Sequence, residues 1–368
     1  MNKINICSSE GSPINPRTWS GTPFHLYSEF KEMGCLDSAF ETKIGKWQNT
    51  LLICISKLVY GSTYDVRRGY LIRYANAALA KRKTAKSACK STLHTGALDL
   101  PFLLKPSGQR HYIYSDSTWN LWSNASTSID NYPKKLVKDA ERLEFKAYQQ
   151  AEHIFSISEY VKDNLISKYG INPDKITVVG TGLGVIKPFF GEKNYKNGKI
   201  LFAAKGRFED KGGPMVLEAF EKALRQNPDL ELIIVGQNEY AEKKLPNVKA
   251  YGFIPIEELQ SIFDECSLFL MPALNEPWGL VYLEALACKM PIVGLNRNSF
   301  PEISGYGKYG FGLDEPDSDK LSQVILSAFS DDKALAEIGL RGQEYCLENF
   351  SWRKTAARII DKINEIEQ

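Results

Sequence analysis

Residues 272–291, PALNEPWGLVYLEALACKMP, are the part of the sequence that decides the fold. An apolar run precedes them, and Pro277 and Gly279 interrupt the chain before an apolar segment at helical spacing. We therefore expect a strand, a turn and then a helix that begins near Leu280. The first turn of a helix directs unpaired N–H groups and the positive end of its dipole at whatever lies before it. This order of elements predicts a parallel α/β fold with a phosphate site at the turn.

Two carboxylates bracket that helix start. Glu276 lies before the helix, and Glu284 lies about one turn inside it. Glu276 is placed to accept hydrogen bonds from sugar hydroxyls, and Glu284 to accept a pair from a ribose diol. The two positions suit a ligand in which a sugar, a diphosphate and a ribose follow one another.

A second strand, glycine turn and helix are predicted in residues 200–220, ILFAAKGRFEDKGGPMVLEAF. Arg207 and Lys211 stand in the loop after the strand, where open α/β sheets bind ligands. Arginine offers a bidentate fork and lysine a compact charge, so the pair is suited to a diphosphate. Together they could neutralise a leaving nucleoside diphosphate without a metal ion.

A third segment, residues 7–24 (CSSEGSPINPRTWSGTPF), follows the first predicted strand. It lacks the G-x-G-x-x-G spacing of a dinucleotide fold, which disfavours a nicotinamide enzyme. Gly21 and Thr22 precede Pro23 at the start of a predicted helix, whose N–H groups could face a ligand. An ordinary long loop is the alternative interpretation of this segment.

Short apolar runs alternate with amphipathic segments along the whole chain, as in parallel α/β sheets. The predicted strands are residues 4–7, 112–114, 153–156, 176–179, 200–204, 230–235, 267–271 and 292–295. They form two series, separated by a stretch rich in Gly, Lys and Asn at residues 182–198. A helix capped by Asp317 is also expected, so that the Asp317-Ser318-Asp319 triplet needs no metal.

Composition places few further limits on the chain. Its 368 residues are enough for two domains, and its seven cysteines lack the spacing of a zinc or redox motif. The longest apolar stretch, residues 51–60, is too short to span a membrane. Residues 1–190 have a net charge of +9 and the remainder −7, which favours an anionic partner for the first half, although a solvated charged face is the alternative.

The ordered set of motifs resembles glycosyltransferase family 4. It consists of GRFEDKGGPMVLEAF, LIIVG, YGFIPIEEL, FLMPALNEPWGLVYLEALACKMPIV and an FSW before the last helix. The resemblance implies the GT-B fold, in which two Rossmann-like domains face each other across a cleft. It divides the chain into an acceptor-binding domain (1–185), a nucleotide-sugar-binding domain (186–350) and a helix that crosses back to the first domain (351–368).

The resemblance also implies individual roles. Glu276 would contact the donor sugar and Glu284 the ribose, while Arg207 and Lys211 would hold the diphosphate. The remaining donor-binding positions are Gly21, Thr22, Gly206, Phe253, Gly279, Leu280 and Val281, with Phe253 beside the base. Many relatives carry His-Asp at the strand end where this chain has Tyr114-Ser115-Asp116-Ser117, so Asp116 keeps the carboxylate. His94 is then the main histidine candidate for lining the cleft or contacting the acceptor.

The function expected from this resemblance is sugar transfer with retention, from a UDP- or GDP-linked donor to a carbohydrate or lipid-linked acceptor in polysaccharide or glycolipid assembly. No metal or other cofactor is expected, and the leaving diphosphate would serve as the base. Two alternatives stay open: a GT-B sugar-nucleotide epimerase and a non-catalytic carbohydrate- or lipid-binding protein. A Rossmann oxidoreductase is disfavoured by the glycine spacing.

A basic segment between Arg67 and Lys90 suggests where an anionic partner could bind. Its basic residues are Arg67, Arg68, Arg73, Lys81, Arg82, Lys83, Lys86 and Lys90. An amphipathic helix of this kind can lie on an anionic membrane, and the alternative is a helix packed on the sheet with solvated charges. We expect a cytoplasmic protein, peripheral on the membrane, and no nucleic-acid binding because aromatic residues are sparse.

Overall fold

The structure is a computed structural model that describes residues 3–99, 108–126, 128–236 and 245–368. The chain forms two compact units. The first contains Met1–Gly182 together with Trp352–Gln368, and the second contains Leu183–Ser351. The boundary between them therefore lies three residues before the predicted one at 185/186.

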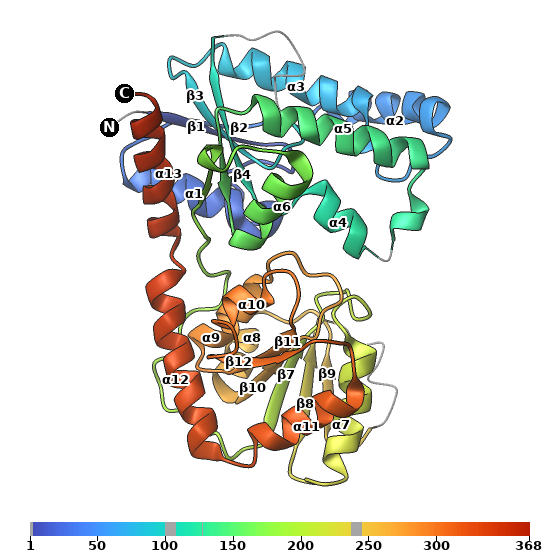
Figure 1. The fold of residues 1–368 in the computed structure, drawn as a ribbon, viewed down its shortest axis with the longest axis vertical. Helices are drawn as coiled ribbons and strands as arrows, with labels where there is room; N and C mark the ends of the chain where they lie inside the picture. The colour runs from blue at the N-terminus through green and yellow to red at the C-terminus, as the bar shows by residue number, and fades with distance from the viewer. Residues whose placement is uncertain (1–2, 100–107, 127, 237–244) are drawn as a thin grey trace. The chain divides into compact units, whose positions relative to one another are not determined.

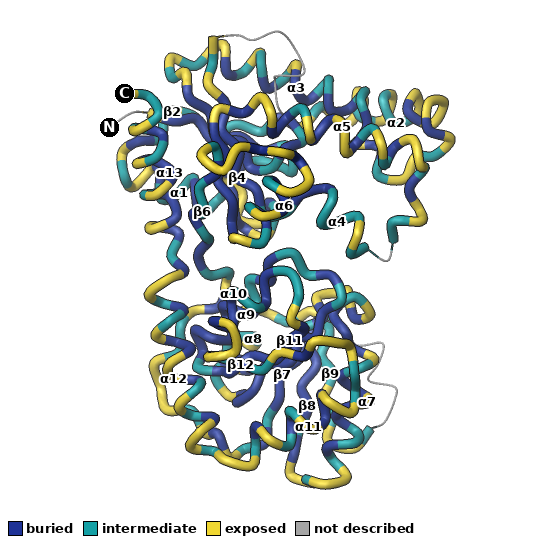
Figure 2. The backbone as a smooth tube through the Cα atoms, in the orientation of Figure 1, coloured by how far each residue is buried: buried dark blue, intermediate teal, exposed yellow. Residues whose placement is uncertain are grey.

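The first unit is built on a parallel six-stranded sheet in the order β2-β1-β3-β4-β5-β6 (Figure 1). The strands are β1 (Ile4–Ser8), β2 (Leu36–Glu41), β3 (Ser91–Thr95), β4 (Arg110–Ser115), β5 (His153–Ser156) and β6 (Ile176–Val178). The helices are α1 (Thr22–Glu32), α2 (Lys46–Tyr60), α3 (Tyr70–Thr84), α4 (Trp119–Ala125), α5 (Lys134–Gln150), α6 (Glu159–Tyr169) and α13 (Trp352–Ile366). The strands are largely buried, as Figure 2 shows.

The second unit repeats this architecture with the strand order β12-β11-β10-β7-β8-β9, again all parallel. The strands are β7 (Lys199–Ala203), β8 (Glu231–Val235), β9 (Val248–Tyr251), β10 (Leu268–Leu270), β11 (Ile292–Leu295) and β12 (Gly310–Leu313). The helices are α7 (Gly213–Leu224), α8 (Ile256–Glu265), α9 (Leu280–Ala287), α10 (Phe300–Ile303), α11 (Ser318–Ala328) and α12 (Asp332–Asn349). Each unit is thus a Rossmann-like α/β domain, as predicted.

Helix starts follow the capping rules that the sequence suggested. Pro23 occupies the first turn of α1, which begins at Thr22 as expected. At α11 the Asp317 carboxylate accepts hydrogen bonds from the N–H groups of Asp319 and Lys320, at 2.9 and 3.1 Å. The prediction that Asp317 is a helix cap is therefore confirmed.

All eight predicted strands are present, with ends shifted by at most two residues, but β2, β3, β9 and β12 were not predicted. The β3 sequence STLHT is mostly polar, although all five residues are buried. The β12 sequence GFGL holds two glycines, which are depleted in strands. These strands lack the apolar run or the alternation by which a strand is recognised in a sequence.

The helix α13 belongs to the first unit, where it packs against α1. The His25 and Trp352 rings are stacked, with centroids 5.2 Å apart. The Thr355 hydroxyl and the Arg358 guanidinium both donate to the Val179 carbonyl, at 3.3 and 3.1 Å. These contacts attach the last helix to residues that follow β6.

The helix α3 does not have the surface that the sequence predicted for it. Arg73, which was counted among the membrane-facing charges, is buried and donates a hydrogen bond to the Ala97 carbonyl. Lys83 donates to the Glu41 carbonyl at 2.6 Å, and Arg68 pairs with Asp65 at 3.0 Å. Arg73 is therefore not available to a membrane surface, which corrects the prediction for this residue. Membrane binding by the rest of the segment stays a prediction.

Glycine is required where α7 begins. Gly212 has φ +83°, and a Cβ there would lie 2.3 Å from the Pro272 carbonyl oxygen. Gly307 has a similar φ of +87° but nothing within 4 Å of the Cβ position. Left-handed backbone costs a residue with a Cβ about 1–2 kcal/mol, and only Gly212→Ala adds a clash with backbone.

We expect Gly307→Ala to lower the free energy of unfolding by about 1 kcal/mol and Gly212→Ala to lower it by about 2 kcal/mol more. Urea unfolding of the two variants measures the difference. Equal losses would mean that the loop at Gly212 moves away from Pro272 without a penalty.

Candidate functional site

The two glycine-containing motifs of the second unit meet at one edge of its sheet. β7 and β10 are neighbours, with Ile200 opposite Leu268 and Phe202 opposite Leu270. Since parallel neighbours end at the same edge, the loops after them lie side by side. The Leu274 N–H donates to the Asp210 carbonyl at 2.9 Å, which joins the two loops directly.

Arg207, Lys211 and Glu276 form a charged cluster on these loops. The Lys211 ammonium is paired with Oε2 of Glu276, and an Arg207 Nη1 lies 4.0 Å from the same oxygen. Arg207 also donates to the Asn275 carbonyl at 3.1 Å and pairs with Asp210 at 3.2 Å. The structure therefore brings together three residues that the sequence had placed in separate motifs.

Lys211 is buried, whereas the Arg207 side chain is 44% exposed. Burial, with the neighbouring charges of Arg207 and Lys205, lowers the pKa of Lys211 to about 7. The charge of Asp210 opposes this shift because an opposite charge stabilises the ammonium. A second anion near Lys211 would stabilise its charged form in the same way.

The start of α9 forms one side of this cluster. Gly279 has φ +75°, and a Cβ there would lie 3.1 Å from Cγ of Glu276, so the turn and the carboxylate are in close contact. Leu280 and Val281 are the first two residues of the helix, as the sequence predicted.

Gly206 lies in the loop after β7 and has φ +71°. A Cβ there would lie 3.6 Å from the Phe253 ring, which is 80% exposed. Phe253 therefore offers an uncovered aromatic face beside the loop of Arg207.

Glu284 has partners that the sequence did not indicate. Its side chain is buried on α9, and Oε1 accepts hydrogen bonds from the N–H groups of Val185 and Ile186, at 2.6 and 3.1 Å. Burial raises the pKa of this carboxyl, and the two N–H groups oppose the rise. A Cβ on Gly184 would lie 2.3 Å from Oε1, so a glycine is needed beside the carboxylate.

Gly21 and Thr22 lie at the start of α1 in the first unit, as predicted. Gly21 has φ +86°, and Trp19 and Ser20 before it also have left-handed backbone, with φ +43° and +56°. Such conformations are strained for residues with a Cβ and often occur at functional sites.

Asp116 follows β4 in the first unit and is partly buried. Burial raises the pKa of its carboxyl to about 7, and the charges of Glu10 and Glu144 add to the rise. Its own backbone N–H and the charge of Arg68 oppose it. This carboxyl can therefore hold or release a proton near neutral pH.

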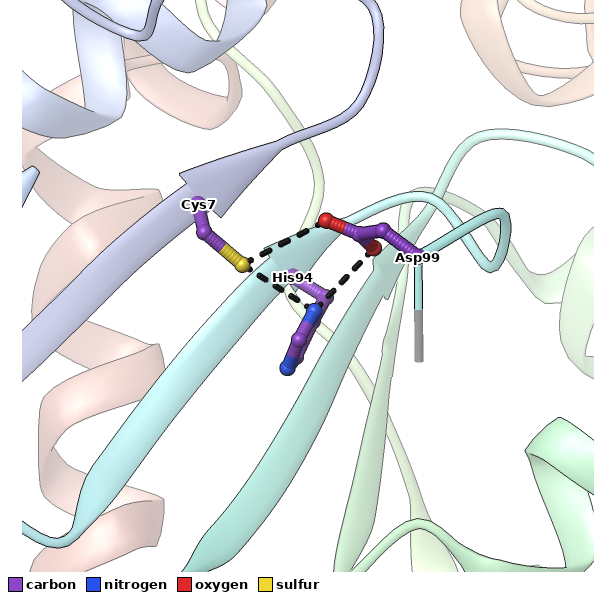
Figure 3. Close-up of side chains that lie close together, drawn as sticks. All are labelled: Cys7, His94 and Asp99. Carbon is purple, nitrogen blue, oxygen red and sulfur yellow. Dashed lines mark hydrogen bonds and ion pairs between the residues drawn. The ribbon is translucent and has the colours of Figure 1, made fainter. Parts of the chain in front are cut away.

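His94 does not line a cleft, which corrects the prediction made for it. It is fully buried on β3, where Nδ1 lies 3.0 Å from Cys7 Sγ and 3.1 Å from Asp99 Oδ1 (Figure 3). Nε2 lies 2.9 Å from Nδ1 of His111. Both ring nitrogens thus have partners inside the core, and the ring cannot reach an acceptor.

Cys7, His94 and Asp99 have the donor atoms of a metal site, all within 4.8 Å of one another. Asp99 also accepts hydrogen bonds from Thr42 and, at 3.5 Å, from the Cys7 thiol. Burial and the neighbouring charge of Asp99 raise the pKa of the Cys7 thiol. Strand pairing brings this cluster together, since Cys7 and His94 are opposite each other in β1 and β3. The sequence carried no signal for it, because β3 was not predicted.

Two family models match parts of the chain. Residues 186–345 match the model described as "Glycosyl transferases group 1", and residues 74–184 match that of "Glycosyltransferase Family 4". Among curated proteins, the chain is 30% identical over 170 residues to a GDP-mannose-dependent alpha-(1-6)-phosphatidylinositol monomannoside mannosyltransferase of Mycolicibacterium smegmatis. That match covers 42% of this chain and 44% of the relative.

Alpha-maltose-1-phosphate synthase of the same organism is 24% identical over 251 residues, which cover 60% of this chain and 64% of that protein. The chain thus spans less than two thirds of the length of both curated relatives. The fold of sucrose-phosphate synthase from Thermosynechococcus elongatus matches with a TM-score of 0.76 at 15% identity, over 100% of this chain and 99% of that one. Anabaena HepE in complex with UDP-glucose matches with a TM-score of 0.67 at 15% identity, over 98% and 99%.

The raised pKa of Asp116 makes stability depend on pH. Between about pH 4 and pH 7 the folded chain keeps a proton that the unfolded chain releases, so stability falls as the pH rises through this range. Asn at this position cannot ionise and avoids the loss. We therefore expect the effect of Asp116→Asn on the free energy of unfolding to be more favourable above pH 7 than below pH 4. The expected difference is on the order of 2 kcal/mol.

Urea unfolding at several pH values measures this difference. Asp163→Asn, at an exposed position on α6 of the same unit, is the matched control. A pH dependence of Asp116→Asn parallel to that of the unsubstituted chain would contradict the assignment.

Proposed function

This chain belongs to the group 1 glycosyltransferases of family 4, with the GT-B fold, and on that basis we propose that it transfers a sugar with retention from a nucleoside diphosphate sugar to a carbohydrate or lipid-linked acceptor. The observation that carries the proposal is the cluster of Arg207, Lys211 and Glu276 beside the start of α9. Cations, a carboxylate and helix N–H groups gathered at one sheet edge are the groups that a sugar diphosphate needs.

In the proposed complex, Arg207 and Lys211 hold the diphosphate together with the backbone of Gly279, Leu280 and Val281. Glu276 is paired with Lys211 in this structure. A bound diphosphate would supply Lys211 with a new anion and so release the Glu276 carboxylate for the sugar hydroxyls.

The outer donor positions extend this arrangement. Glu284 would accept a hydrogen bond from the ribose, and the exposed ring of Phe253 and the nearby Gly206 would flank the base. The donor nucleotide is UDP or GDP. A GDP-mannose-dependent relative and a neighbour solved with UDP-glucose support these two classes.

In the transfer step, the bond between the anomeric carbon and the diphosphate oxygen breaks and a bond to the acceptor oxygen forms on the same face of the sugar. The proton of the acceptor hydroxyl goes to the leaving diphosphate. Arg207 and Lys211 stabilise the charge that grows on this leaving group, so no metal ion and no protein nucleophile are required.

The acceptor side is proposed for the first unit, where Asp116 is the candidate catalytic carboxylate. Gly21 and Thr22 of this unit stay candidate donor-binding residues. We also propose peripheral contact of this unit with an anionic membrane on the cytoplasmic face, in keeping with a lipid-linked acceptor. None of the described helices is both long and apolar enough to cross a membrane.

We expect nucleotide release from one UDP- or GDP-sugar of a panel to depend on an added acceptor, and Arg207→Ala to lower its turnover roughly 10²-fold. Arg225→Ala is the matched control, because Arg225 is an exposed arginine of the same unit that pairs with Glu221 on α7. Release of a free epimerised sugar or sugar nucleotide without acceptor would favour an epimerase. Donor binding without turnover, or near-normal turnover in Arg207→Ala, would overturn the proposal.

Activity should survive EDTA, since Arg207, Lys211 and the start of α9 supply the positive charge that a metal ion supplies in other transferases. The measurement is turnover after dialysis against EDTA, with Mg²⁺ and Mn²⁺ added back. Complete loss that either ion restores would show that the reaction needs a metal.

A further inference from the structure

The helix α2 exposes a row of large apolar side chains. Trp47 is 90% exposed, Leu58 87% and Leu51 60%. These residues recur at spacings of four and seven, which places them on one face of the helix. Ile55 and Val59 extend the row, being 38% and 40% exposed. Figure 2 shows exposed residues along much of α2.

The opposite face of α2 is already used for packing. Ser56 and Tyr60 are buried, and Leu52 and Ile53 pack against the apolar cluster that also contains Tyr60 and Val66. The exposed row is therefore separate from the face of α2 that packs against the core. It is a second apolar face on a helix that is held in place by the first.

The charged residues of α2 itself have one sign, and Asp139 of α5 lies on its packed side, where it accepts a hydrogen bond from Tyr60 at 3.0 Å. Between Glu41 and Asp65 the sequence contains three lysines, Lys43, Lys46 and Lys57, and no acidic residue. All three lysines are exposed. Lys135 of α5 adds a fourth charge at the end of the helix, with Nζ 3.5 Å from the Val59 carbonyl.

We propose that α2 is the element that binds the membrane, lying in the surface of an anionic bilayer with Trp47, Leu51 and Leu58 inserted among the lipids. A tryptophan and leucines on one face with lysines at its edges are the composition of helices that lie in this interface. At 15 residues α2 extends about 22 Å, too short to span a bilayer core of about 30 Å. The helix therefore lies on the membrane and does not cross it.

The charges favour an anionic lipid surface over a second copy of the chain. Two α2 helices packed through their outer faces would bring like-charged lysines together without acidic partners. An anionic bilayer supplies the opposite charge to each of them. The inference rests on the membrane contact proposed above and is independent of the transfer reaction.

The test is co-sedimentation with phosphatidylcholine vesicles that contain increasing shares of phosphatidylglycerol, at low and high salt. We expect binding to rise with phosphatidylglycerol, and Trp47→Ser combined with Leu58→Ser to weaken it about tenfold or more. Leu340→Ser is the control, since Leu340 is a 47% exposed leucine on α12 of the other unit. Arg82→Glu combined with Lys86→Glu, at exposed positions at and after the end of α3, tests the basic segment separately.

An environment-sensitive dye on Cys54, which is exposed on α2, reports insertion directly in a Cys89→Ser background, where the other five cysteines are buried. Its emission should shift to the blue on anionic vesicles. Undiminished binding of the Trp47→Ser/Leu58→Ser variant, or no blue shift, overturns the inference. Absence of vesicle binding by the unsubstituted chain overturns it together with the membrane contact, whereas the transfer reaction is tested independently by donor turnover in solution.

Discussion

The pairing of β7 with β10 is the constraint on which the rest of the candidate site depends. These strands are separated in the sequence by α7, β8, β9 and α8, yet they are neighbours in the sheet. Because both run in the same direction, the loop that carries Lys211 and the loop that carries Glu276 end at one edge. The close approach of Gly212 to the Pro272 carbonyl and the hydrogen bond from Leu274 to Asp210 then fix the separation of the loops.

Burial disfavours the charged forms of two ionisable side chains near this edge. A buried ammonium at Lys211 and a buried carboxylate at Glu284 are each unfavourable unless opposite charge or hydrogen-bond donors surround them. Glu276 supplies the opposite charge for Lys211, and two backbone N–H groups donate hydrogen bonds to Glu284. Such groups respond strongly to any ligand that brings charge, as expected of residues that bind rather than only support the fold.

The parts of the structure that the sequence predicted are those that local chemistry determines. Apolar β-branched runs identified eight strands, and Pro23, Gly279 and Asp317 marked helix starts correctly. β3 was not predicted because STLHT is mostly polar. Its burial depends on neighbouring segments whose positions do not follow from the local sequence. His94 and Arg73 were misjudged for the same reason, since a polar side chain in a core cannot be distinguished locally from one at the surface.

In the candidate site, too, some features could be predicted from local motifs and others depend on distant segments. Arg207, Lys211 and Glu276 could be proposed from motifs alone, and the structure brings them together. Two contacts could not be predicted from motifs: the hydrogen bonds from residues 185 and 186 to Glu284, and the Cys7–His94–Asp99 network. Each joins segments whose proximity depends on the whole sheet. The outer face of α2 was also missed. Its apolar spacing is the same whether the helix is covered or exposed. The membrane contact was predicted at the basic segment that follows it instead.

The return of α13 to the first unit determines the order in which the two units can be completed during synthesis. The second unit is one continuous stretch, Leu183–Ser351, whereas the first needs Trp352–Gln368 as well as Met1–Gly182. The ribosome therefore adds every residue of the second unit before it adds the helix α13 of the first. Until then α1 lacks the Trp352 ring that stacks on His25, and Val179 lacks the donors of Thr355 and Arg358. The first unit is thus completed only after the whole of the second has been synthesised.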